Sequence, residues 1–376
     1  MATKKGSELK DIMAGIEAAA GNVGKGKKPH LTLGNEMPEV DIVSFGIPSV
    51  DAASNVGGMP RGVIIEIFGP EGSGKSYTCY KTIASYQAAG YKAMLLDVEN
   101  AFWHEWIARA GVDIANLVVG RDFESGEQAL RYAEVACLSR AFGVIVIDSV
   151  AALLPQSEAD ANLDQNAKVG AHAAMMSRCL RKLQGVSATT DTTLFFTNQT
   201  RSKIGVMFGN PEETPGGKAL KFYSGMRIGL QYIGKEMAKQ EGVEKPIGIR
   251  TKIKFIKNKI GQPFGEDEFV IYSVEGINTP MVQLVNLAIR LRVVGRKSFD
   301  QDPKNKTFSY KDSEGVQDTG CKTASDLAEW FDANELVPTI VEAIIAKGKD
   351  RNVDIPEEVK ALAKPAETDA VTELQS

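Results

Sequence analysis

Residues 69–76 read Gly-Pro-Glu-Gly-Ser-Gly-Lys-Ser, and their types and spacing are those of a loop that holds nucleotide phosphates. In the pattern Gly-x-x-x-x-Gly-Lys-Ser/Thr, the glycines let backbone N–H groups and the positive end of the next helix face phosphate oxygens. Lys75 would reach the β and γ phosphates, and the Ser76 hydroxyl would be a ligand of Mg²⁺. The alternative is a chance glycine-rich turn, which is rare for a complete match. The predicted phosphate-binding loop consists of Gly69, Pro70, Glu71, Gly72, Ser73, Gly74, Lys75 and Ser76.

The segments on both sides of this loop have the periodicity that the motif requires. Residues 63–68 are an apolar, β-branched run of strand length, and residues 77–88 have helical spacing without Gly or Pro. A strand, a phosphate-binding loop and a helix in this order are the structural context of the motif. The flanking segments therefore favour nucleotide binding over a chance turn.

Three later apolar runs of strand length end in the polar residues Glu99, Asp148 and Gln199. A carboxylate that closes four apolar residues is the Walker B arrangement, in which Asp148 would hold Mg²⁺ through its water shell. Glu99 is then the candidate base that orients the attacking water, and Gln199 would hydrogen-bond the γ phosphate and sense its loss. The alternative is that these residues are helix caps or solvated strand ends, where polar side chains are common.

The composition is that of an ordinary soluble protein, with 376 residues, 43% apolar and 24% charged. A formal charge of −4 gives no general preference for nucleic acid, so any such binding must come from local patches. The four cysteines lie far apart without a Cys-x-x-Cys pair, which indicates neither zinc nor disulfides and fits a reducing cytoplasm. The sequence shows no leader and no apolar run of about 18 residues, so we expect a cytoplasmic protein without a membrane partner.

From about residue 41 to residue 272, apolar runs of strand length alternate with helical stretches. This alternation predicts an α/β fold, a mostly parallel sheet with helices on both faces, whose ligands bind beyond the carboxyl ends of the strands. Before it, residues 8–20 have the spacing of an amphipathic helix, followed by the glycine-rich, basic residues 21–28. That helix would pack on its own domain or dock on a neighbouring subunit, and its periodicity is compatible with both.

Residues 201–217 form a predicted loop that is unusually long for a compact domain, and long loops tend to be functional. The apolar Ile204 stands near Arg201 and Lys203, which suits single-stranded nucleic acid: cations contact phosphates and apolar side chains contact base faces. An earlier loop, residues 155–169, precedes a helix that presents Arg178, Arg181 and Lys182. The alternative is two surface loops and a solvated helix face.

Residues 251–259 begin with strand alternation and end with two lysines, Lys257 and Lys259, on one face. One interpretation is that these charges protect an edge strand from aggregation. The other requires contact between subunits, because lysines delivered across an interface to a γ phosphate would act as an arginine finger does.

Several of these motifs stand in the order found in RecA, the family of bacterial recombinases: residues 69–75, 147–153, 203–212, 216–223 and 257–260. The chain resembles this family over about residues 35–285, and residues 203–223 are close to diagnostic. The resemblance implies a RecA-type P-loop ATPase core that uses ATP and Mg²⁺. It also implies a helical filament of identical subunits on single-stranded DNA, a homology search in duplex DNA, and strand exchange, with ATP hydrolysis allowing release.

Site residues follow from the resemblance by position. Lys75, Ser76, Asp148, Glu99 and Gln199 take the roles described above, and Lys257 and Lys259 match the pair that reaches the ATP of the neighbouring subunit. Trp106 stands where the family usually stacks a tyrosine on adenine. Residues 155–169 match the first DNA loop and residues 201–217 the second. Further matches are Ser177, Arg181, Gly216 and Gly217 to positions that contact the DNA backbone, and Val169 and Ile204 to positions that enter between base triplets.

The sequence departs from the family pattern in several places. Trp103 replaces an aspartate near the base, Ala174 stands where an arginine is common, and one residue is inserted in the first DNA loop. Beyond residue 285 the similarity fades, although a basic stretch would suit a C-terminal domain that captures duplex DNA. Such divergence would suit a bacteriophage or plasmid-borne recombinase. The basic stretch consists of Arg290, Arg292, Arg296, Lys297, Lys304 and Lys306.

The sequence therefore predicts four segments. These are an N-terminal helix and linker for subunit contact (1–34), the ATPase core with its DNA-binding loops (35–280), a small α+β C-terminal domain (281–350) and a mildly acidic tail (351–376). One alternative function is a ring-forming RecA-fold DNA motor, a helicase or branch-migration ATPase, against which the absence of zinc-finger cysteines speaks. The other is a non-catalytic, ATP-gated DNA scaffold, against which Glu99 speaks.

Overall fold

In the computed structural model the chain divides into two compact units, Met1–Asp41 and Ile42–Ser376. The boundaries predicted near residues 34, 280 and 350 stay predictions. The described residues are 2–20, 31–37, 40–162, 170–202, 212–240, 243–272, 284–285, 287–288, 291, 293–297, 307–311, 316–321, 324–350, 355, 359–360 and 362–363.

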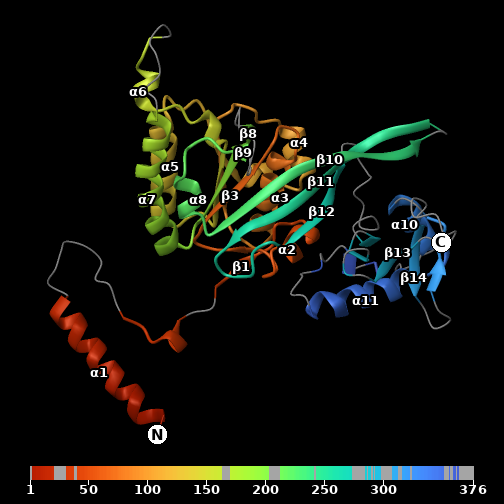
Figure 1. The fold of residues 1–376 in the computed structure, drawn as a ribbon, viewed down its shortest axis with the longest axis horizontal. Helices are drawn as coiled ribbons and strands as arrows, with labels where there is room; N and C mark the ends of the chain where they lie inside the picture. The colour runs from red at the N-terminus through yellow and green to blue at the C-terminus, as the bar shows by residue number, and fades with distance from the viewer. Residues whose placement is uncertain are drawn as a thin grey trace, which may run out of the picture. The chain divides into compact units, whose positions relative to one another are not determined.

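The centre of the larger unit is an eight-stranded sheet in the order β12-β11-β10-β3-β7-β6-β4-β5 (Figure 1). The strands from β10 to β5 run parallel, whereas β11 and β12 run antiparallel to their neighbours. The predicted α/β fold with a mostly parallel sheet is thereby confirmed. The strands are β3 (Ile64–Gly69), β4 (Ala93–Asp97), β5 (Leu117–Gly120), β6 (Val144–Asp148), β7 (Thr193–Gln199), β10 (Met226–Gln240), β11 (Val243–Asn258) and β12 (Glu266–Tyr272).

Helices cover both faces of this sheet because alternate side chains of each strand point to opposite sides. On one face, Ile65 and Ile67 of β3 pack in a core with α2, α3 and α4. On the other face, Ile64 packs in a second core with α5, α7 and α8. These helices are α2 (Pro48–Ala53), α3 (Lys75–Ala88), α4 (His104–Arg109), α5 (Gly126–Leu138), α7 (Ala171–Thr190) and α8 (Ala219–Tyr223).

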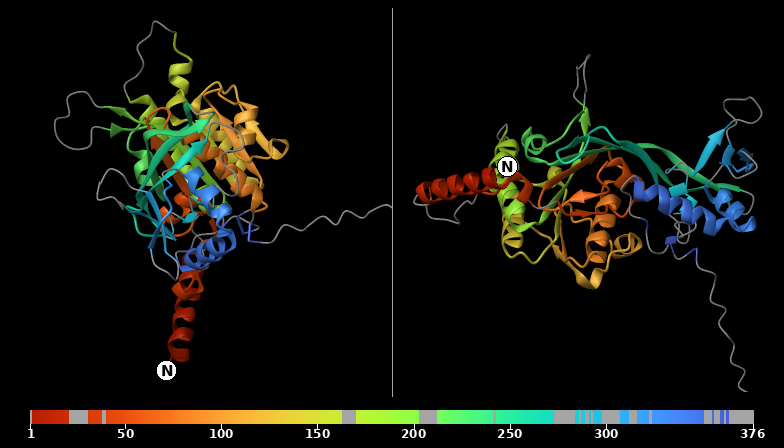
Figure 2. Two further views of the ribbon diagram at one scale, coloured as in Figure 1. Left: turned by 90° about the vertical axis from the view of Figure 1, so that its right-hand side faces the viewer. Right: turned by 90° about the horizontal axis from the view of Figure 1, so that it is seen from below.

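The hairpin of β10 and β11 is longer than the sequence indicated, with strands of 15 and 16 residues. Its outer half extends past the rest of the sheet (Figures 1 and 2). Arg250 joins three strands there, because its guanidinium lies 3.5 Å from a Glu236 carboxylate oxygen on β10 and 3.2 Å from one of Glu268 on β12. β11 lies between two strands only over Gly248–Lys254, where β12 pairs with it, whereas Lys257 pairs with β10. The interpretation of Lys257 and Lys259 as edge-strand protection therefore stays a prediction.

Short elements connect the main ones and lie partly in the predicted DNA loops. The segment predicted as the first loop contains α6, and the second begins in β8, which pairs with β9 later in the same segment. The elements are β1 (Ile42–Val43), β2 (Met59–Pro60), η2 (Ile114–Asn116), η3 (Val150–Ala152), α6 (Gln156–Ala159), β8 (Arg201–Ser202) and β9 (Glu212–Glu213).

The N-terminal unit contains the predicted amphipathic helix as α1 (Ala2–Ala20), followed by the 3-10 helix η1 (Gly34–Glu36). An ion pair of 2.8 Å between Lys10 Nζ and Glu36 Oε1 joins the two. The chain near its C-terminus has an apolar core of its own, formed by residues such as Phe331 and Ile340. Its elements are β13 (Val294–Lys297), β14 (Thr307–Lys311), β15 (Val316–Asp318), α10 (Ala324–Ala333) and α11 (Val337–Asp350).

No helix among the described residues combines the length and hydropathy that crossing a lipid bilayer requires. The predicted cytoplasmic location stays a prediction.

The start of α5 allows a test of local stability. Ser125 Oγ accepts a hydrogen bond from Gln128 N at 3.2 Å, and Gln128 Oε1 accepts one from Glu124 N at 2.8 Å. We expect Ser125→Ala to lower the free energy of unfolding by about 1 kcal/mol, because it removes the acceptor for an otherwise unpaired N–H group. Ser125→Thr keeps that acceptor and should lose less. Urea unfolding followed by circular dichroism measures both, and equal losses would contradict a capping role.

Candidate functional site

The phosphate-binding loop runs from the end of β3 into α3, as the sequence predicts. Gly74 stands before the helix with a φ of 90°, a conformation that side-chain-bearing residues rarely adopt. A Cβ at this position would also overlap Ile271 Cδ1 of β12. The glycine is therefore required both for the turn and for the close approach of the loop to the sheet.

Lys75 turns back onto its own loop, where its Nζ donates a hydrogen bond to the Pro70 carbonyl oxygen at 2.8 Å. Burial lowers the pKa of Lys75, and the negative charges of Asp148 and Glu99 oppose that shift. An ammonium with nearby carboxylates and few solvent contacts is suited to hold an anion between itself and the backbone N–H groups.

Asp148 ends β6 and is held by two hydroxyls. Thr197 Oγ1 of the neighbouring strand donates to Asp148 Oδ1 at 2.5 Å, and Ser76 also hydrogen-bonds to the carboxylate. Burial raises the pKa of Asp148, with further contributions from the charges of Glu99 and Asp97. The structure thus brings together the two predicted ligands of Mg²⁺, and a cation would compensate for the burial of this carboxylate.

The donor set fits a magnesium ion that is shared with a nucleotide. Among the described residues, no three His, Cys, Asp or Glu side chains form a cluster that would hold a metal by itself. Mg²⁺ typically binds through one or two protein oxygens, several waters and substrate phosphates. The hydroxyl of Ser76 and the carboxylate of Asp148 match that requirement.

Glu99 and Gln199 also lie together, at the carboxyl ends of strands that are close in the sheet. Gln199 Nε2 lies 3.5 Å from Glu99 Oε1, and Ser149 Oγ donates a hydrogen bond to the same oxygen. Ser149, directly after Asp148, was not predicted as a site residue, although its place after the Walker B carboxylate could have indicated it. The predicted base and the predicted γ-phosphate sensor therefore belong to one cluster.

Asp97 fixes the segment that carries Glu99. Its two carboxylate oxygens accept hydrogen bonds from the backbone N–H groups of Ala101 and Phe102, each at 3.0 Å. Arg121 Nε lies 3.3 Å from one of these oxygens. The segment between β4 and α4 is thus held by a buried carboxylate, which limits the positions open to Glu99.

The predicted base-stacking residue Trp106 lies on α4 beside the first turn of α3. Its ring packs on Tyr77, with centroids 6.2 Å apart and planes tilted by 52°. Trp103, at the start of the same helix, is 68% exposed. Because Tyr77 follows the phosphate-binding loop directly, Trp106 lies near the place where the nucleoside of a bound nucleotide would be expected.

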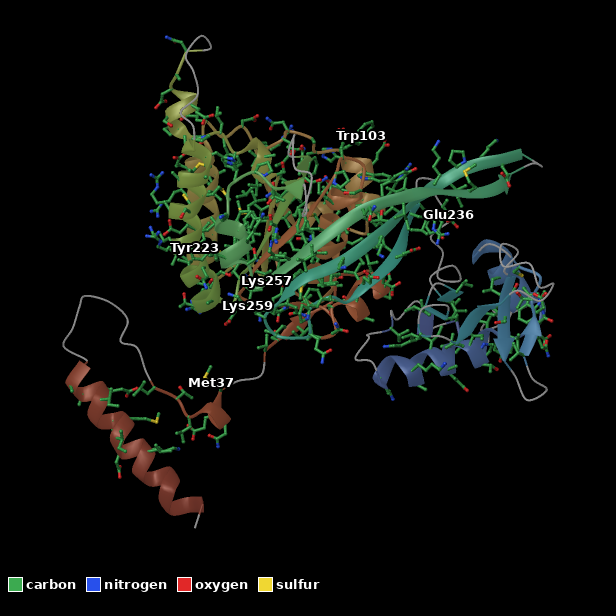
Figure 3. All side chains as sticks on the ribbon, viewed as in Figure 1. Met37, Trp103, Tyr223, Glu236, Lys257 and Lys259 are labelled. Carbon is green, nitrogen blue, oxygen red and sulfur yellow. The ribbon has the colours of Figure 1, made fainter. Side chains whose placement is uncertain are left out.

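Lys257 and Lys259 lie far from the phosphate loop of their own subunit. Lys257 pairs with Arg227 across the hairpin, and Arg227 pairs with Glu66 in the middle of β3, whereas the loop follows the end of that strand. Lys257 Nζ donates to the carbonyl oxygens of Lys221 and Phe222 at 2.7 and 3.0 Å. Figure 3 shows both lysines near Tyr223 of α8, at the end of the core away from Trp103.

Asn258 holds the turn between these lysines and was not predicted as a site residue. Its side-chain amide donates to the Ser54 carbonyl oxygen at 2.8 Å and accepts from the N–H groups of Ile260 and Gly261 at 3.2 Å each. The pattern Lys-Asn-Lys names this residue, but only the fold shows that Ser54, far along the chain, is its partner. Asn258 fixes the direction in which Lys259 leaves the sheet.

The basic residues predicted for DNA binding lie along α7. Ala174, Ser177, Arg178, Arg181 and Lys182 line a surface hollow. Arg178 is partly engaged already, because its Nη2 lies 3.0 Å from Glu127 Oε1. Arg181 is exposed.

Gly216 and Gly217 pack against the start of this helix. Gly217 has a φ of 70°, and a Cβ there would lie 2.9 Å from Ala173 Cβ. Arg201 lies in β8, opposite Glu213 of β9, and only its backbone is described. Val169, Lys203 and Ile204 lie outside the described residues, as do most members of the basic stretch beyond residue 285.

A phosphate-binding loop before α3, together with acidic and amide side chains at the ends of adjacent parallel strands, defines an α/β nucleotide-binding ATPase core. Residues 9–278 match the family model of the RecA N-terminal domain. The protein RecA of Bacteroides thetaiotaomicron is 41% identical over 307 residues, 81% of this chain and 88% of the relative. The protein RecA of Chlorobaculum tepidum is 39% identical over 322 residues, which are 83% of this chain and 91% of the relative. The protein RecA of Thermus aquaticus is 43% identical over 272 residues, which are 72% of this chain and 78% of the relative.

The chain belongs to the RecA family. It is accordingly an ATP-dependent homologous recombination protein, a DNA-dependent ATPase that binds DNA, forms filaments and catalyses strand exchange. The family favours this function over the two alternatives, a ring-forming DNA motor and a non-catalytic scaffold.

The buried carboxylate of Asp148 leads to a test of the site's electrostatics. Because its folded pKa is raised above the unfolded value, ionisation of Asp148 destabilises the folded protein at neutral pH. We expect Asp148→Asn to raise the melting temperature of the nucleotide-free protein at neutral pH and to abolish nucleotide turnover. The gain in melting temperature should shrink as the pH falls toward about 4, where the wild-type group is protonated as well.

Calorimetric melts of both proteins across this pH range give the measurement, with turnover assayed at neutral pH. A gain that does not change with pH would mean that the carboxylate's charge is not its cause.

Proposed function

We propose that the loop from Gly69 to Ser76 binds ATP, with Lys75 on the β and γ phosphates and with Ser76 and Asp148 holding Mg²⁺. The hydrogen bond between Ser76 and Asp148 and the raised pKa of the carboxylate support a cation at this place. When bound, the ion neutralises charge on the transferred phosphate. Trp106 provides a face for the adenine.

Glu99 orients the attacking water, and Gln199 reports whether a γ phosphate is present. The contact between Gln199 Nε2 and Glu99 Oε1, 3.5 Å long, supports this pairing of roles. Gln199 lies at the same end of the sheet as the phosphate loop, because it pairs in register with Gly69, and Glu99 contacts Gln199 there. A γ phosphate in the loop would therefore lie near both of them.

The single-stranded DNA site comprises α7 with Ser177, Arg178 and Arg181, the segment after β7 with Arg201, Lys203 and Ile204, and the turn of Gly216 and Gly217. Val169 belongs to the first DNA loop. The hollow along α7 and the close packing of Gly217 on Ala173 support a continuous surface at this place. Homologous duplex DNA is the second partner, and the C-terminal domain takes part in capturing it.

The filament is a helical assembly of identical subunits, formed through α1 and the edge of the sheet. Leu9, Ile12 and Ile16 make a half-exposed apolar stripe on α1. A similar stripe runs along α5 at Tyr132, Val135 and Leu138, and β5 among the described strands pairs with β4 alone. Two apolar stripes and an open strand edge on one chain are complementary surfaces for head-to-tail assembly.

The observation that carries this function is the separation of the two lysines from their own phosphate loop. Lys257 lies level with Glu66 in the middle of β3, whereas ATP would lie beyond the end of that strand. Lys75 already provides a cation within the subunit. Lys257 and Lys259 therefore serve the ATP of a neighbouring subunit, as an arginine finger does.

Complementation between two inactive variants tests this arrangement. One variant carries Lys257→Ala and Lys259→Ala, and the other carries Glu99→Gln. Each alone should bind ATP and DNA but hydrolyse ATP slowly, whereas mixtures on DNA should recover turnover. Interfaces that combine an intact Glu99 with the lysines of the other variant are competent. If co-assembled mixtures show no activity above that of the separate proteins, the lysines act within their own subunit.

Arg181 allows a separate test of the DNA surface. We expect Arg181→Ala to reduce the slope of log affinity against log salt for single-stranded DNA by roughly 0.7, the contribution of one neutralised phosphate. Fluorescence anisotropy titrations over a series of salt concentrations measure this slope. Lys92→Ala serves as a control, because Lys92 lies outside the proposed DNA surface. Equal slopes for Arg181→Ala and wild type would place the guanidinium away from phosphate.

A further inference from the structure

Glu66 is a fully buried carboxylate in the middle of β3 and takes no part in the phosphate loop. Both of its oxygens are used. Asn198 Nδ2 donates to Oε1 at 3.0 Å, and Arg227 Nε donates to Oε2 at 2.5 Å. The Arg227 guanidinium also lies over the Phe68 ring, 4.7 Å from its centroid. Three adjacent strands, β7, β3 and β10, are thus joined by buried polar side chains, with Arg227 level with Glu66 and Asn198 level with Phe68.

Asn198 is the branching point of this network. Its side-chain Nδ2 also donates to the Pro215 carbonyl oxygen at 3.1 Å, and its Oδ1 accepts from the Gln199 N–H at 3.0 Å. One fully buried amide therefore contacts Glu66, the end of the segment proposed to bind DNA, and the backbone of the proposed γ-phosphate sensor.

Pro215 lies near the end of residues 201–217, the segment proposed to bind DNA, so a movement of that segment would displace it. The next residues, Gly216 and Gly217, pack closely on η3 and α7: a Cβ at Gly216 would lie 3.2 Å from Val150 Cγ1, and one at Gly217 would lie 2.9 Å from Ala173 Cβ. These contacts leave little free space, so a displacement of this segment by DNA would be passed to Pro215 rather than absorbed. The hydrogen bond from Pro215 to Asn198 then reaches Gln199.

A purely structural role explains this arrangement poorly. Replacement of buried ion pairs by apolar side chains of similar volume is often neutral or stabilising. Glu66 instead has apolar neighbours along its own strand, Ile65 and Ile67, and is itself the polar exception. Its carboxylate orients the Asn198 amide, because an accepting oxygen at that place decides which way the amide faces.

We propose that Glu66 is a positioning residue that, through Asn198, couples the end of the DNA segment at Pro215 to Gln199. The coupling makes ATP turnover respond to DNA. This inference rests on the proposed function, in which residues 201–217 contact DNA and Gln199 senses the γ phosphate. Arg227 holds Glu66 in place through the hydrogen bond to Oε2.

The test compares Asn198→Ala and Glu66→Gln with Tyr86→Phe as a matched control. Tyr86 Oη donates to Thr193 Oγ1 at 2.7 Å, a buried hydrogen bond at the other end of β7. DNA stimulation is the ratio of ATP turnover with DNA to turnover without it. We expect this ratio to be about tenfold smaller in the two network variants than in wild type, within the usual range of coupling between sites. DNA-independent turnover, the KM for ATP and DNA affinity should stay within about twofold. Tyr86→Phe should lower the melting temperature but retain full stimulation.

A double variant separates positioning from stability. With Glu66→Gln alone, one carbonyl oxygen must replace two acceptors. The charged Arg227 is the stronger donor, so the oxygen turns toward it, the new amide group faces Asn198 Nδ2, and the hydrogen bond with Asn198 is lost. Glu66→Gln combined with Arg227→Gln supplies an acceptor for that amide and lets the Asn198 contact persist. We expect the pair to recover most of the stimulation that the single Glu66→Gln variant loses. Asn198→Ser replaces Asn198→Ala if the latter does not fold.

The outcomes distinguish this inference from the proposed function. If wild type is stimulated by single-stranded DNA and Gln199→Ala is stimulated to the same extent, the sensing role that the proposed function gives to Gln199 is wrong. If wild type is stimulated and Asn198→Ala or its substitute is stimulated equally, the coupling role is wrong. Equal losses of stimulation in Tyr86→Phe and Glu66→Gln would also overturn it, because stability alone would then explain the effect.

Discussion

The parallel alignment of the central strands is the constraint on which this site depends. In-register pairing of β3 with β7 and of β4 with β6 brings Gly69 level with Gln199 and Asp97 level with Asp148. β4 and β6 are apolar up to the aspartates that end them, and β7 ends in Gln199, so these polar side chains meet at the carboxyl ends of the strands. Any slip of register by one residue would turn these side chains to the opposite face.

The same constraint crowds like charges into a region of low exposure. Asp97, Glu99 and Asp148 lie close enough for the first to contribute, with Glu99, to the raised pKa of Asp148. Within the subunit, hydrogen bonds from Thr197 and Ser76 and the charge of Lys75 only partly offset this repulsion. A site of this kind is less stable without its ligands than an apolar one would be, and ligand binding relieves the strain. Stability and function oppose each other most directly at Asp148.

The sequence was sufficient for those parts of the site that are local in the chain. The phosphate loop and the carboxylates that close apolar runs are recognisable because spacing within a few residues decides their chemistry. Partners far along the chain could not be predicted. Asn258 and Ser54 are 204 residues apart, Asn198 and Glu66 are 132 apart, and Thr197 and Asp148 are 49 apart.

The strand β12, which pairs with β11 over Gly248–Lys254, shows a further limit of sequence patterns. The strand that covers β11 is β12, which begins with Glu266, Asp267 and Glu268 and so lacks an apolar start. Acidic residues fit there because basic residues of β11 lie opposite. Lys252 Nζ lies 3.2 Å from Glu266 Oε1, and Lys252 pairs with Glu268 in register. Cross-strand charge pairing thus stabilises a strand that a hydrophobic pattern alone does not reveal.

The position of Lys257 links filament assembly to the DNA segment. In the single subunit its ammonium donates hydrogen bonds to carbonyl oxygens in the last turn of α8. Burial together with the charges of Lys259 and Arg227 lowers the pKa of Lys257. A phosphate of a neighbouring subunit offers far more negative charge than two carbonyl oxygens, so on the proposed function the lysine exchanges one set of acceptors for the other. α8 then loses a cation at its C-terminal end, while its N-terminal end follows Gly217 directly. The ATP-dependent contact between subunits and the DNA-dependent contact within one subunit therefore act on opposite ends of the same short helix.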